Sequence, residues 1–241
     1  MRTIKLAVLG LFAAGAAAGL PASPASALTI QVSVDSFKDG GVITNQYGFC
    51  VPAAQGHTAP GPDISPRISW SKGPAGTRSY AVILTDTDSP TIRDNMNKEG
   101  VTVAADMPRR TFFHLVLIDI PASVTSISKG AESKARVPHG KQDPAKVGVH
   151  GINDFGIRVF PNNEQMKGGY FGYDGPCPPW NDERPHHYHF TVYALSVSSL
   201  DIGGAFDGPT AMAAMQGKVL AQGEANGYYS QNPAYPAKPM K

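Results

Sequence analysis

The segment Phe-Phe-His-Leu-Val-Leu-Ile-Asp-Ile occupies residues 112–120. It is the strongest apolar run after the N-terminal segment, and Pro121 ends it. A continuous apolar run of this length is short for a helix and typical of a central strand that is covered on both faces. The segment Tyr188–Val197 alternates apolar and polar residues and predicts a second central strand. Shorter strands are expected at residues 28–34, 42–44, 68–70 and 80–85.

Turn-forming residues are abundant in the rest of the chain. The 241 residues include 26 Gly and 21 Pro, well above the average usage of roughly 12% for the two together, so long helices must be few. Segments without periodicity, at residues 50–66, 89–110 and 121–167, are predicted to be long irregular loops. One helix is expected to begin with Thr210 as N-cap and to end at Gly223, with Met212, Met215 and Val219 on one face.

The chain is therefore predicted to form one mainly β domain of antiparallel strands over residues 28–229, with a C-terminal helix. The remaining residues, 230–241, contain three prolines and are expected to form a flexible C-terminal tail.

The first 27 residues have the features of a signal peptide. Arg2 and Lys5 precede an apolar stretch at residues 6–19, and Ala25-Ser26-Ala27 supplies the small-x-small pattern that signal peptidase needs. The stretch is too short for a stable membrane span, which takes about 20 apolar residues. We expect cleavage after Ala27 and a secreted or periplasmic protein without stable membrane insertion.

The expected mature chain has no net charge. Removing residues 1–27 takes away two basic groups and leaves 19 basic and 19 acidic residues. A nucleic-acid-binding protein would need a basic surface, so no nucleic-acid partner is expected.

Two cysteines are present, Cys50 and Cys177. They either form a disulfide or remain two separate buried thiols, and two thiols alone cannot make a four-ligand zinc site. A disulfide would close a long loop, which is associated with about 3–5 kcal/mol of stabilisation.

Strand alternation indicates which polar side chains can share a site. From His186 onward, one face of the strand carries residues that should point to the core, with the first two at its mouth: His186, Tyr188, Phe190, Val192 and Ala194. In the run 112–120, His114 is expected on the same face as Phe112, Val116, Ile118 and Ile120. Asp86 and Asp88 follow a third strand. Each histidine alone could be a satisfied core residue, but together these groups indicate a site.

Two other kinds of site are open from the residues. His187 and His189 share the outward face and could chelate a metal if Asp182 or His139 converged, or they could be solvated surface residues. The four groups Asp86, His114, His186 and Tyr188 could perform acid–base catalysis. However, no Gly-x-Ser-x-Gly elbow is present, and a disulfide to Cys50 would disable Cys177 as a nucleophile. We expect no catalytic residues, no metal and no cofactor.

Several short motifs occur in a specific order. They are Ile64-Ser65-Pro66 with Ser69-Trp70, Pro74-Ala75-Gly76-Thr77, Asp86-Thr87-Asp88-Ser89-Pro90, His114 before Ile120-Pro121, Asn153-Asp154-Phe155-Gly156, Gly175-Pro176-Cys177-Pro178-Pro179, Pro185-His186-His187-Tyr188, and Val219-Leu220-Ala221 with Gly227-Tyr228. This set resembles the phosphatidylethanolamine-binding protein family, in its bacterial branch often labelled Raf kinase inhibitor-like. The resemblance spans residues 29–229.

The resemblance implies an antiparallel β-sandwich of Greek-key type with a small pocket for a phosphate-type anion, such as a phospholipid head group or a phosphorylated ligand. Its pocket residues fall on Asp86, His114, His186 and Tyr188, its proline-rich rim on Gly175, Cys177, Pro178 and Pro179, and Asp88 and Pro90 complete the expected ligand-binding set. Imidazole N–H groups can donate to phosphate oxygens, and Asp86 can fix a histidine tautomer.

The chain departs from the family pattern at three positions near the site. Leu115 stands where the family usually has Trp, His187 where it has Arg, and Thr87 where it has Pro. An aromatic wall and a permanent positive charge should therefore be missing. Residues 157–167 also have the character of an insertion near the pocket mouth.

The expected function is that of an exported, non-catalytic binding protein for a phosphate-type anion. Because relatives are associated with kinases or proteases, an inhibitor of an extracellular protein partner, such as a protease, is the alternative, along with an enzyme that uses the pocket.

Overall fold

The computed structural model describes residues 29–35, 37–141 and 144–239. The predicted signal peptide, residues 1–27, lies outside the described residues. No helix in the described part of the chain is long and apolar enough to cross a membrane.

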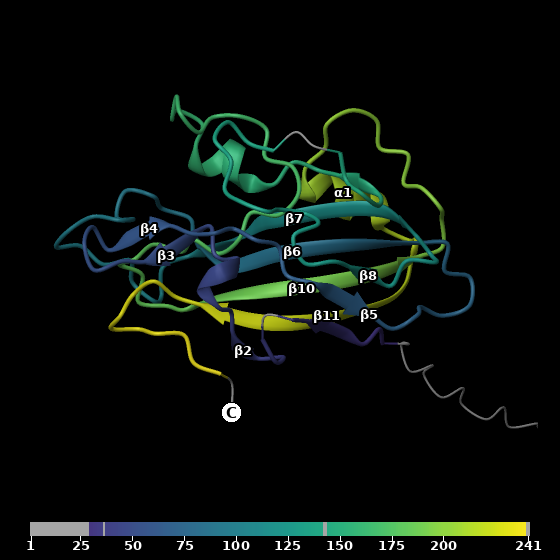
Figure 1. The fold of residues 1–241 in the computed structure, drawn as a ribbon, viewed down its shortest axis with the longest axis horizontal. Coiled ribbons are helices and arrows are strands. Elements are labelled where there is room, and N and C mark those ends of the chain that lie inside the picture. The colour runs from purple at the N-terminus through teal and green to yellow at the C-terminus, as the bar shows by residue number, and fades with distance from the viewer. Residues whose placement is uncertain (1–28, 36, 142–143, 240–241) are drawn as a thin grey trace, which may run out of the picture.

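A six-stranded sheet forms the centre of the molecule (Figure 1). Its strands, in spatial order, are β2 (Gly41–Val42), β11 (Val219–Tyr229), β10 (His186–Leu195), β6 (Ser79–Pro90), β7 (Arg109–Pro121) and β9 (Val149–His150). All neighbours are antiparallel except β2 and β11. The two strands predicted to be central are therefore interior strands of this sheet.

A smaller sheet packs against one face of the large sheet. It contains β1 (Val32–Val34), β5 (Ile68–Trp70) and β8 (Ser126–Ile127), and a separate hairpin pairs β3 (Cys50–Pro52) with β4 (Thr58–Pro60). The core between the two sheets joins Val34, Ile68 and Trp70 to Val82 and Phe190. The structure thus confirms a mainly antiparallel β-sandwich whose sheets do not close into a barrel.

The apolar run of residues 112–120 is covered on both faces, as predicted. Leu115 and Leu117 point into the core between the sheets, whereas Val116 and Ile118 pack on the opposite face with helix α1 (Gly208–Met215). All four side chains are at most 1% exposed. A strand that is buried on both faces needs apolar residues at successive positions, which explains the continuous run.

The predicted alternation of this run is wrong at two points. Leu84 pairs with Leu115 but Thr85 pairs with Phe113, so His114 is an extra residue and does not share a face with Val116. A second irregularity lies at Asp119, whose φ is 56°, and it places Ile118 and Ile120 on opposite faces. Each bulge inserts one residue and reverses the alternation beyond it.

The C-terminal helix is shorter than predicted, and a strand follows it. Its N-cap is Asp207, whose carboxylate accepts a hydrogen bond from the Thr210 N–H at 3.0 Å. Gly217, with a φ of 72°, turns the chain, and β11 begins at Val219. The expected continuation to Gly223 is wrong because β11 pairs with β10 along its length.

The loops expected at residues 50–66, 89–110 and 121–167 contain short elements. The first holds the β3–β4 hairpin, the second holds the ends of β6 and β7, and the third holds β8, β9 and a π-helical turn, η2 (Phe155–Val159). Elements of two to five residues are too short to produce a recognisable period.

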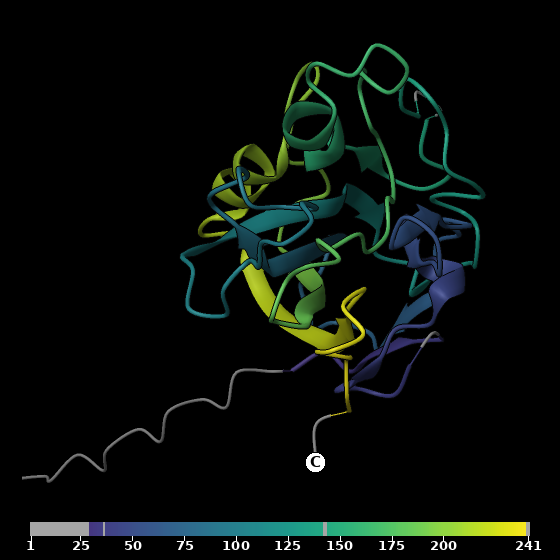
Figure 2. The same ribbon diagram turned by 90° about the vertical axis from the view of Figure 1, so that its left-hand side faces the viewer.

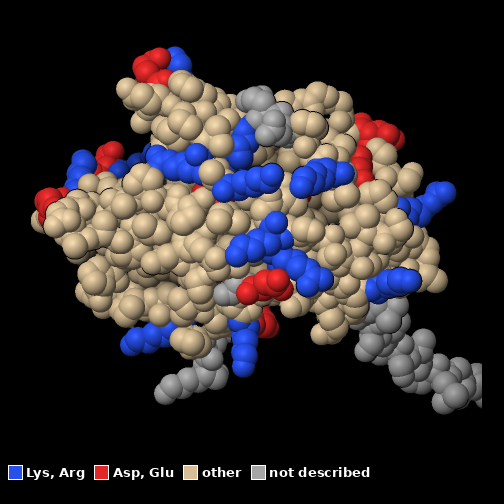
Figure 3. Space-filling model, in the orientation of Figure 1, with Lys and Arg blue, Asp and Glu red and all other residues tan. Residues whose placement is uncertain are grey.

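The surface charge is not evenly spread, although residues 28–241 contain equal numbers of basic and acidic groups. On the face seen in Figure 3, Lys and Arg side chains form a band across the middle of the molecule, and Asp and Glu lie mostly toward its margins. The equal totals of basic and acidic residues therefore do not show that positive charge is in local excess on this face.

We predict that Leu117→Ala lowers the free energy of unfolding by about 2–5 kcal/mol, because it leaves a cavity in the core between the sheets. Urea unfolding followed by circular dichroism measures the change. Val219→Ala, at a side chain that is 39% exposed, is the matched control and should change stability by no more than about 0.5 kcal/mol. Equal effects of the two variants would contradict this assignment of the core.

Candidate functional site

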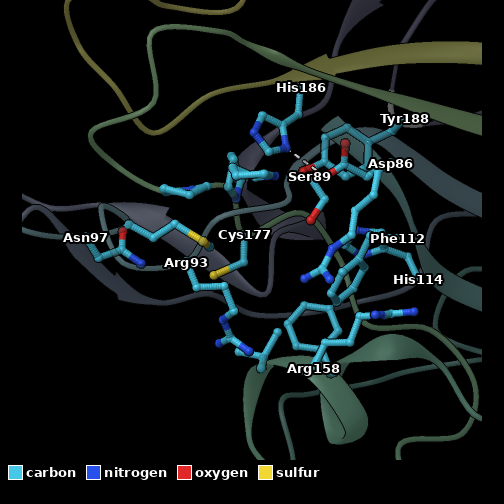
Figure 4. A pocket seen from close by; sticks show the side chains of 17 residues that line it. Asp86, Ser89, Arg93, Asn97, Phe112, His114, Arg158, Cys177, His186 and Tyr188 are labelled. Atoms are coloured by element: carbon cyan, nitrogen blue, oxygen red, sulfur yellow. Dashed lines mark hydrogen bonds and ion pairs between the residues drawn. The ribbon is translucent and has the colours of Figure 1, made fainter. Parts of the chain in front are cut away.

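A cavity of about 220 Å³ opens at one end of the large sheet. Figure 2 looks onto this end, which the β3–β4 hairpin, the C-terminal segment and η2 surround. The end of β6, the start of β7 and the start of β10 supply its inner residues, and Figure 4 shows their side chains. The residues that line it are Asp86, Ser89, Pro90, Arg93, Met96, Asn97, Arg110, Phe112, His114, Phe155, Arg158, Val159, Cys177, Pro178, Pro179, His186 and Tyr188.

The structure brings together most of the side chains that the sequence indicated. Eight of them line the cavity: Asp86, Pro90, His114, Cys177, Pro178, Pro179, His186 and Tyr188. Asp88 and Gly175 do not line it. The Asp88 carboxylate accepts hydrogen bonds from Arg184 and His187 instead, and the Gly175 N–H donates to Asp63 at 2.8 Å.

His186 is held between two carboxylates. Its Nδ1 donates to Asp86 Oδ2 at 2.7 Å and its Nε2 donates to Asp182 Oδ2 at 3.1 Å. Asp182 in turn accepts two hydrogen bonds from Arg109, at 2.6 and 2.9 Å. Negative and positive groups therefore alternate along the series Asp86, His186, Asp182, Arg109.

This arrangement fixes the charge of His186. Burial opposes protonation, but the charge of Asp86 and the hydrogen bond to Asp182 raise the pKa of His186 to about 9. His186 is thus an imidazolium at neutral pH with both N–H groups engaged. It contributes a positive charge beside the cavity, but it has no free N–H for a ligand, contrary to the expectation that both imidazoles donate.

His114 has the opposite character. Its Nδ1 donates to the carbonyl of Asp174 at 2.7 Å, and burial lowers the pKa of the ring. The ring is therefore neutral at pH 7, and its Nε2 carries a lone pair that has no partner among the described residues. Tyr188 packs against it, with ring centroids 5.2 Å apart.

The Tyr188 hydroxyl is buried and has no hydrogen-bond partner in the described part of the chain. Burial and the nearby negative charge of Asp86 raise the pKa of this phenol, so it stays protonated and available as a donor. A buried donor without a partner costs free energy, and such groups in a cavity are typically satisfied by a ligand or by water.

Sequence reasoning missed three arginines, Arg93, Arg110 and Arg158, which come from three separate segments. Arg93 and Arg110 lie in the segment expected to be an irregular loop, and Arg158 lies in the expected insertion. No local pattern links them. The one signal available was the expected position of residues 157–167 near the pocket mouth, and the structure confirms that position through Arg158 and Val159.

The departures from the family pattern have little effect on the pocket walls. Leu115, in place of Trp, is fully buried in the core between the sheets, and Phe112 and Phe155 line the cavity with aromatic surface. His187, in place of Arg, turns away and binds Asp88 at 2.6 Å. The missing aromatic wall and positive charge are thus supplied by other segments.

A disulfide fixes the proline-rich rim. Cys50 and Cys177 are bonded, which decides between the two states that the sequence left open. On the far side of the rim, the carbonyl of Pro178 accepts a hydrogen bond from Gln231, and the Trp180 N–H donates to Asn97 Oδ1 at 3.1 Å. The first residues of the expected C-terminal tail are therefore held against the rim.

Three of the side chains considered for a metal are engaged elsewhere. Asp182 binds Arg109 and His186, His187 binds Asp88, and His189 lies 3.7 Å from Glu224. Among the described residues, no group of three histidine, cysteine or carboxylate side chains is arranged to hold a metal ion.

The charge of His186 predicts a pH dependence of stability. Its pKa is about 9 in the folded protein and 6.5 for the free side chain, so its stabilisation is complete below pH 6.5 and is lost as the pH rises through 9. The loss is on the order of 3 kcal/mol. Urea unfolding across this range measures it.

His186→Asn should remove this slope, although it also lowers stability at every pH. His189→Asn, on the outward face of the same strand, should keep the wild-type slope. If the wild type and His186→Asn lost the same amount of stability as the pH rises through 9, His186 could not be the charged, buried group.

Comparison with known proteins places the chain among relatives of similar length. A UPF0098 protein of Aquifex aeolicus is 32% identical over 203 residues, covering 84% of this chain and 90% of the relative, and the UPF0098 protein YbcL of Escherichia coli is 28% identical over 207 residues, covering 85% and 90%. The crystal structure of E. coli YbcL, described as a new member of the mammalian PEBP family, matches with a TM-score of 0.58 and 27% identity over 84% of this chain and 99% of that one.

A putative PEBP homologue from Chlamydia trachomatis, CT736, has the same fold, with a TM-score of 0.55, 24% identity and coverage of 84% and 97% of the two chains. The family model for phosphatidylethanolamine-binding protein matches residues 33–230, which include the whole six-stranded sheet and every residue that lines the cavity. The chain therefore belongs to the phosphatidylethanolamine-binding protein family.

Proposed function

We propose that the protein is an exported, non-catalytic binding protein whose cavity takes the phosphate group of a small ligand or of a lipid head group. The observation that carries this proposal is the pair of unengaged polar atoms at the inner end of the cavity, Tyr188 Oη and His114 Nε2. Tyr188 can donate a hydrogen bond to a phosphate oxygen. His114 Nε2 can accept one from a P–OH group, or take up the proton.

The charges around the cavity favour an anion. His186 is balanced by Asp86, Arg109 by Asp182, and Arg158 lies 3.0 Å from Asp154. Arg93 and Arg110 have no ion-pair partner among the described residues. The lining of the cavity is therefore left with an excess of positive charge, which a phosphate dianion would neutralise.

The size of the cavity limits what can enter. A volume of about 220 Å³ is below the range of about 300–1,000 Å³ of sites that enclose drug-sized ligands. A phosphomonoester or a compact head group fits this volume, whereas an acyl chain would remain outside.

A binding role is favoured over catalysis by the state of the acid–base groups. His186 and Asp86 are locked in hydrogen bonds to each other, and Cys177 is in a disulfide and cannot act as a thiolate nucleophile. His114 is the one imidazole of the lining with a free nitrogen in the described chain, and no side-chain nucleophile is hydrogen-bonded to it.

We predict that glycerol 3-phosphate binds several-fold more tightly at about pH 6 than at about pH 8. The second pKa of such an ester is about 6, so the dianion prevails at the higher pH, and the lone pair of His114 Nε2 must gain a proton before it can contact this dianion. Calorimetry in buffers of different ionisation enthalpy should show uptake of about one proton per ligand at the higher pH.

Tyr188→Phe should weaken binding about tenfold or more, because a hydrogen bond to a charged group is lost. His114→Gln should abolish the pH dependence. The control is His189→Gln, which alters an outward-facing histidine of β10, the strand that carries Tyr188, and should bind as the wild type does. Unchanged affinity in both Tyr188→Phe and His114→Gln would refute the proposal.

Export is supported by the sequence of residues 1–27 and by the disulfide, because disulfides persist mainly outside the cytoplasm. We predict that protein released from the periplasm or the medium begins at Leu28, as read by N-terminal sequencing. Ala27→Lys should block cleavage and leave the uncleaved precursor, whereas the control Ser26→Lys should be processed. Accumulation of the uncleaved wild-type chain in the cytoplasm would contradict export.

A further inference from the structure

We propose that the outer part of the cavity is a second anion subsite, formed by Arg93, Arg110 and Arg158, so that the ligand carries two acidic groups. The phosphate would bind at Tyr188 and His114, and a second anionic group would bind at the arginines. This inference rests on the proposed function and specifies the chemical class of its ligand as a diphosphate or a phosphomonoester that bears another acid.

The three arginines converge from distant parts of the chain. Arg93 follows the end of β6, Arg110 lies near the start of β7, and Arg158 is in η2, and all three line the same cavity. Figure 4 shows Arg93 and Arg158 on the side of the cavity that is away from His186 and Tyr188. Arg93 and Arg158 are therefore placed to contact a part of the ligand other than the phosphate at Tyr188.

Their charges are poorly compensated. Of the described carboxylates, Asp154 is the one that pairs with this group, through Arg158 Nε at 3.0 Å, and its other oxygen accepts the Phe113 N–H at 3.0 Å. The buried Nε of Arg110 has no hydrogen-bond partner among the described residues. An anion at this point would supply the missing acceptor and charge.

The guanidinium groups are close enough to repel one another. Burial, followed by the positive charges of Arg158 and Arg93, lowers the pKa of Arg110, and Asp154 opposes this effect only in part. Like charges that are held together without counter-charges are unfavourable, and binding of an anion removes this cost.

The cavity has no comparable place for an ammonium group. Asp86 is the one carboxylate that lines the described cavity, and both of its oxygens are engaged, by the Asp88 N–H at 2.7 Å and by His186 at 2.7 Å. A zwitterionic phosphoethanolamine would place its ammonium group among the arginines. A second acidic group at the same distance from the phosphate would meet favourable charge instead.

The test compares three soluble probes by calorimetry: inorganic phosphate, pyrophosphate and phosphoethanolamine. Wild-type protein should bind pyrophosphate about tenfold more tightly than phosphate, and phosphoethanolamine no more tightly than phosphate. Arg110→Gln and Arg93→Gln should each remove most of the preference for pyrophosphate and change phosphate affinity much less. Arg78→Gln, an exposed arginine just before β6 at the opposite end of the sheet, is the control and should retain the preference.

Two results would overturn the second subsite while leaving the proposed function intact. The first is that the wild type binds phosphate and pyrophosphate with equal affinity. The second is that Arg110→Gln weakens the binding of both probes by the same factor. In either case Tyr188→Phe must still weaken phosphate binding. If Tyr188→Phe binds phosphate as the wild type does, the proposed function itself fails. If the preference for pyrophosphate is observed, sedimentation with phosphatidylcholine vesicles that contain diacylglycerol pyrophosphate distinguishes a lipid source of the diphosphate from a free one.

Discussion

The buried series of charges Asp86, His186, Asp182 and Arg109 is the interaction on which the pocket depends. It joins the end of β6, the start of β10, the rim loop and the start of β7. Each member is buried or nearly so, and each is satisfied by its neighbours. Removing one partner of a buried ion pair typically costs about 3–5 kcal/mol, because the other charge remains buried and uncompensated. The same contacts therefore stabilise the strand ends and hold the inner wall of the cavity in one geometry.

This series also divides the cavity into two chemical environments. At the inner end, the carboxylates and His186 neutralise one another, which leaves Tyr188 and the neutral His114 as the groups with free polar atoms. At the outer end, the arginines have too few counter-charges. The proline-rich rim is held by the Cys50–Cys177 disulfide on one side and by Gln231 on the other. A rigid rim reduces the entropy lost on binding, which favours a preformed site.

The differences from the family pattern show how the character of a cavity wall can be kept by residues at other positions. The Leu115 side chain packs in the core between the sheets and does not line the pocket. The aromatic surface of the pocket comes from Phe112 and Phe155. Positive charge comes from Arg93, Arg110 and Arg158 instead of the residue after His186. A change at one position of a motif therefore does not define the chemistry of a cavity, because side chains from remote segments share its walls.

The sequence by itself determined the mainly β fold, the central position of residues 112–120 and eight of the seventeen residues that line the cavity, because apolar periodicity and the ordered motifs are local properties of the chain. It did not determine which face His114 occupies, since a bulge of one residue reverses the alternation and leaves no mark on composition. It also did not determine the end of α1, since a strand that pairs with β10 overrides a weak helical pattern. Only the tertiary structure decided that both nitrogens of His186 are engaged and that three arginines meet, because charges separated by long stretches of chain interact through space and not through spacing in the sequence.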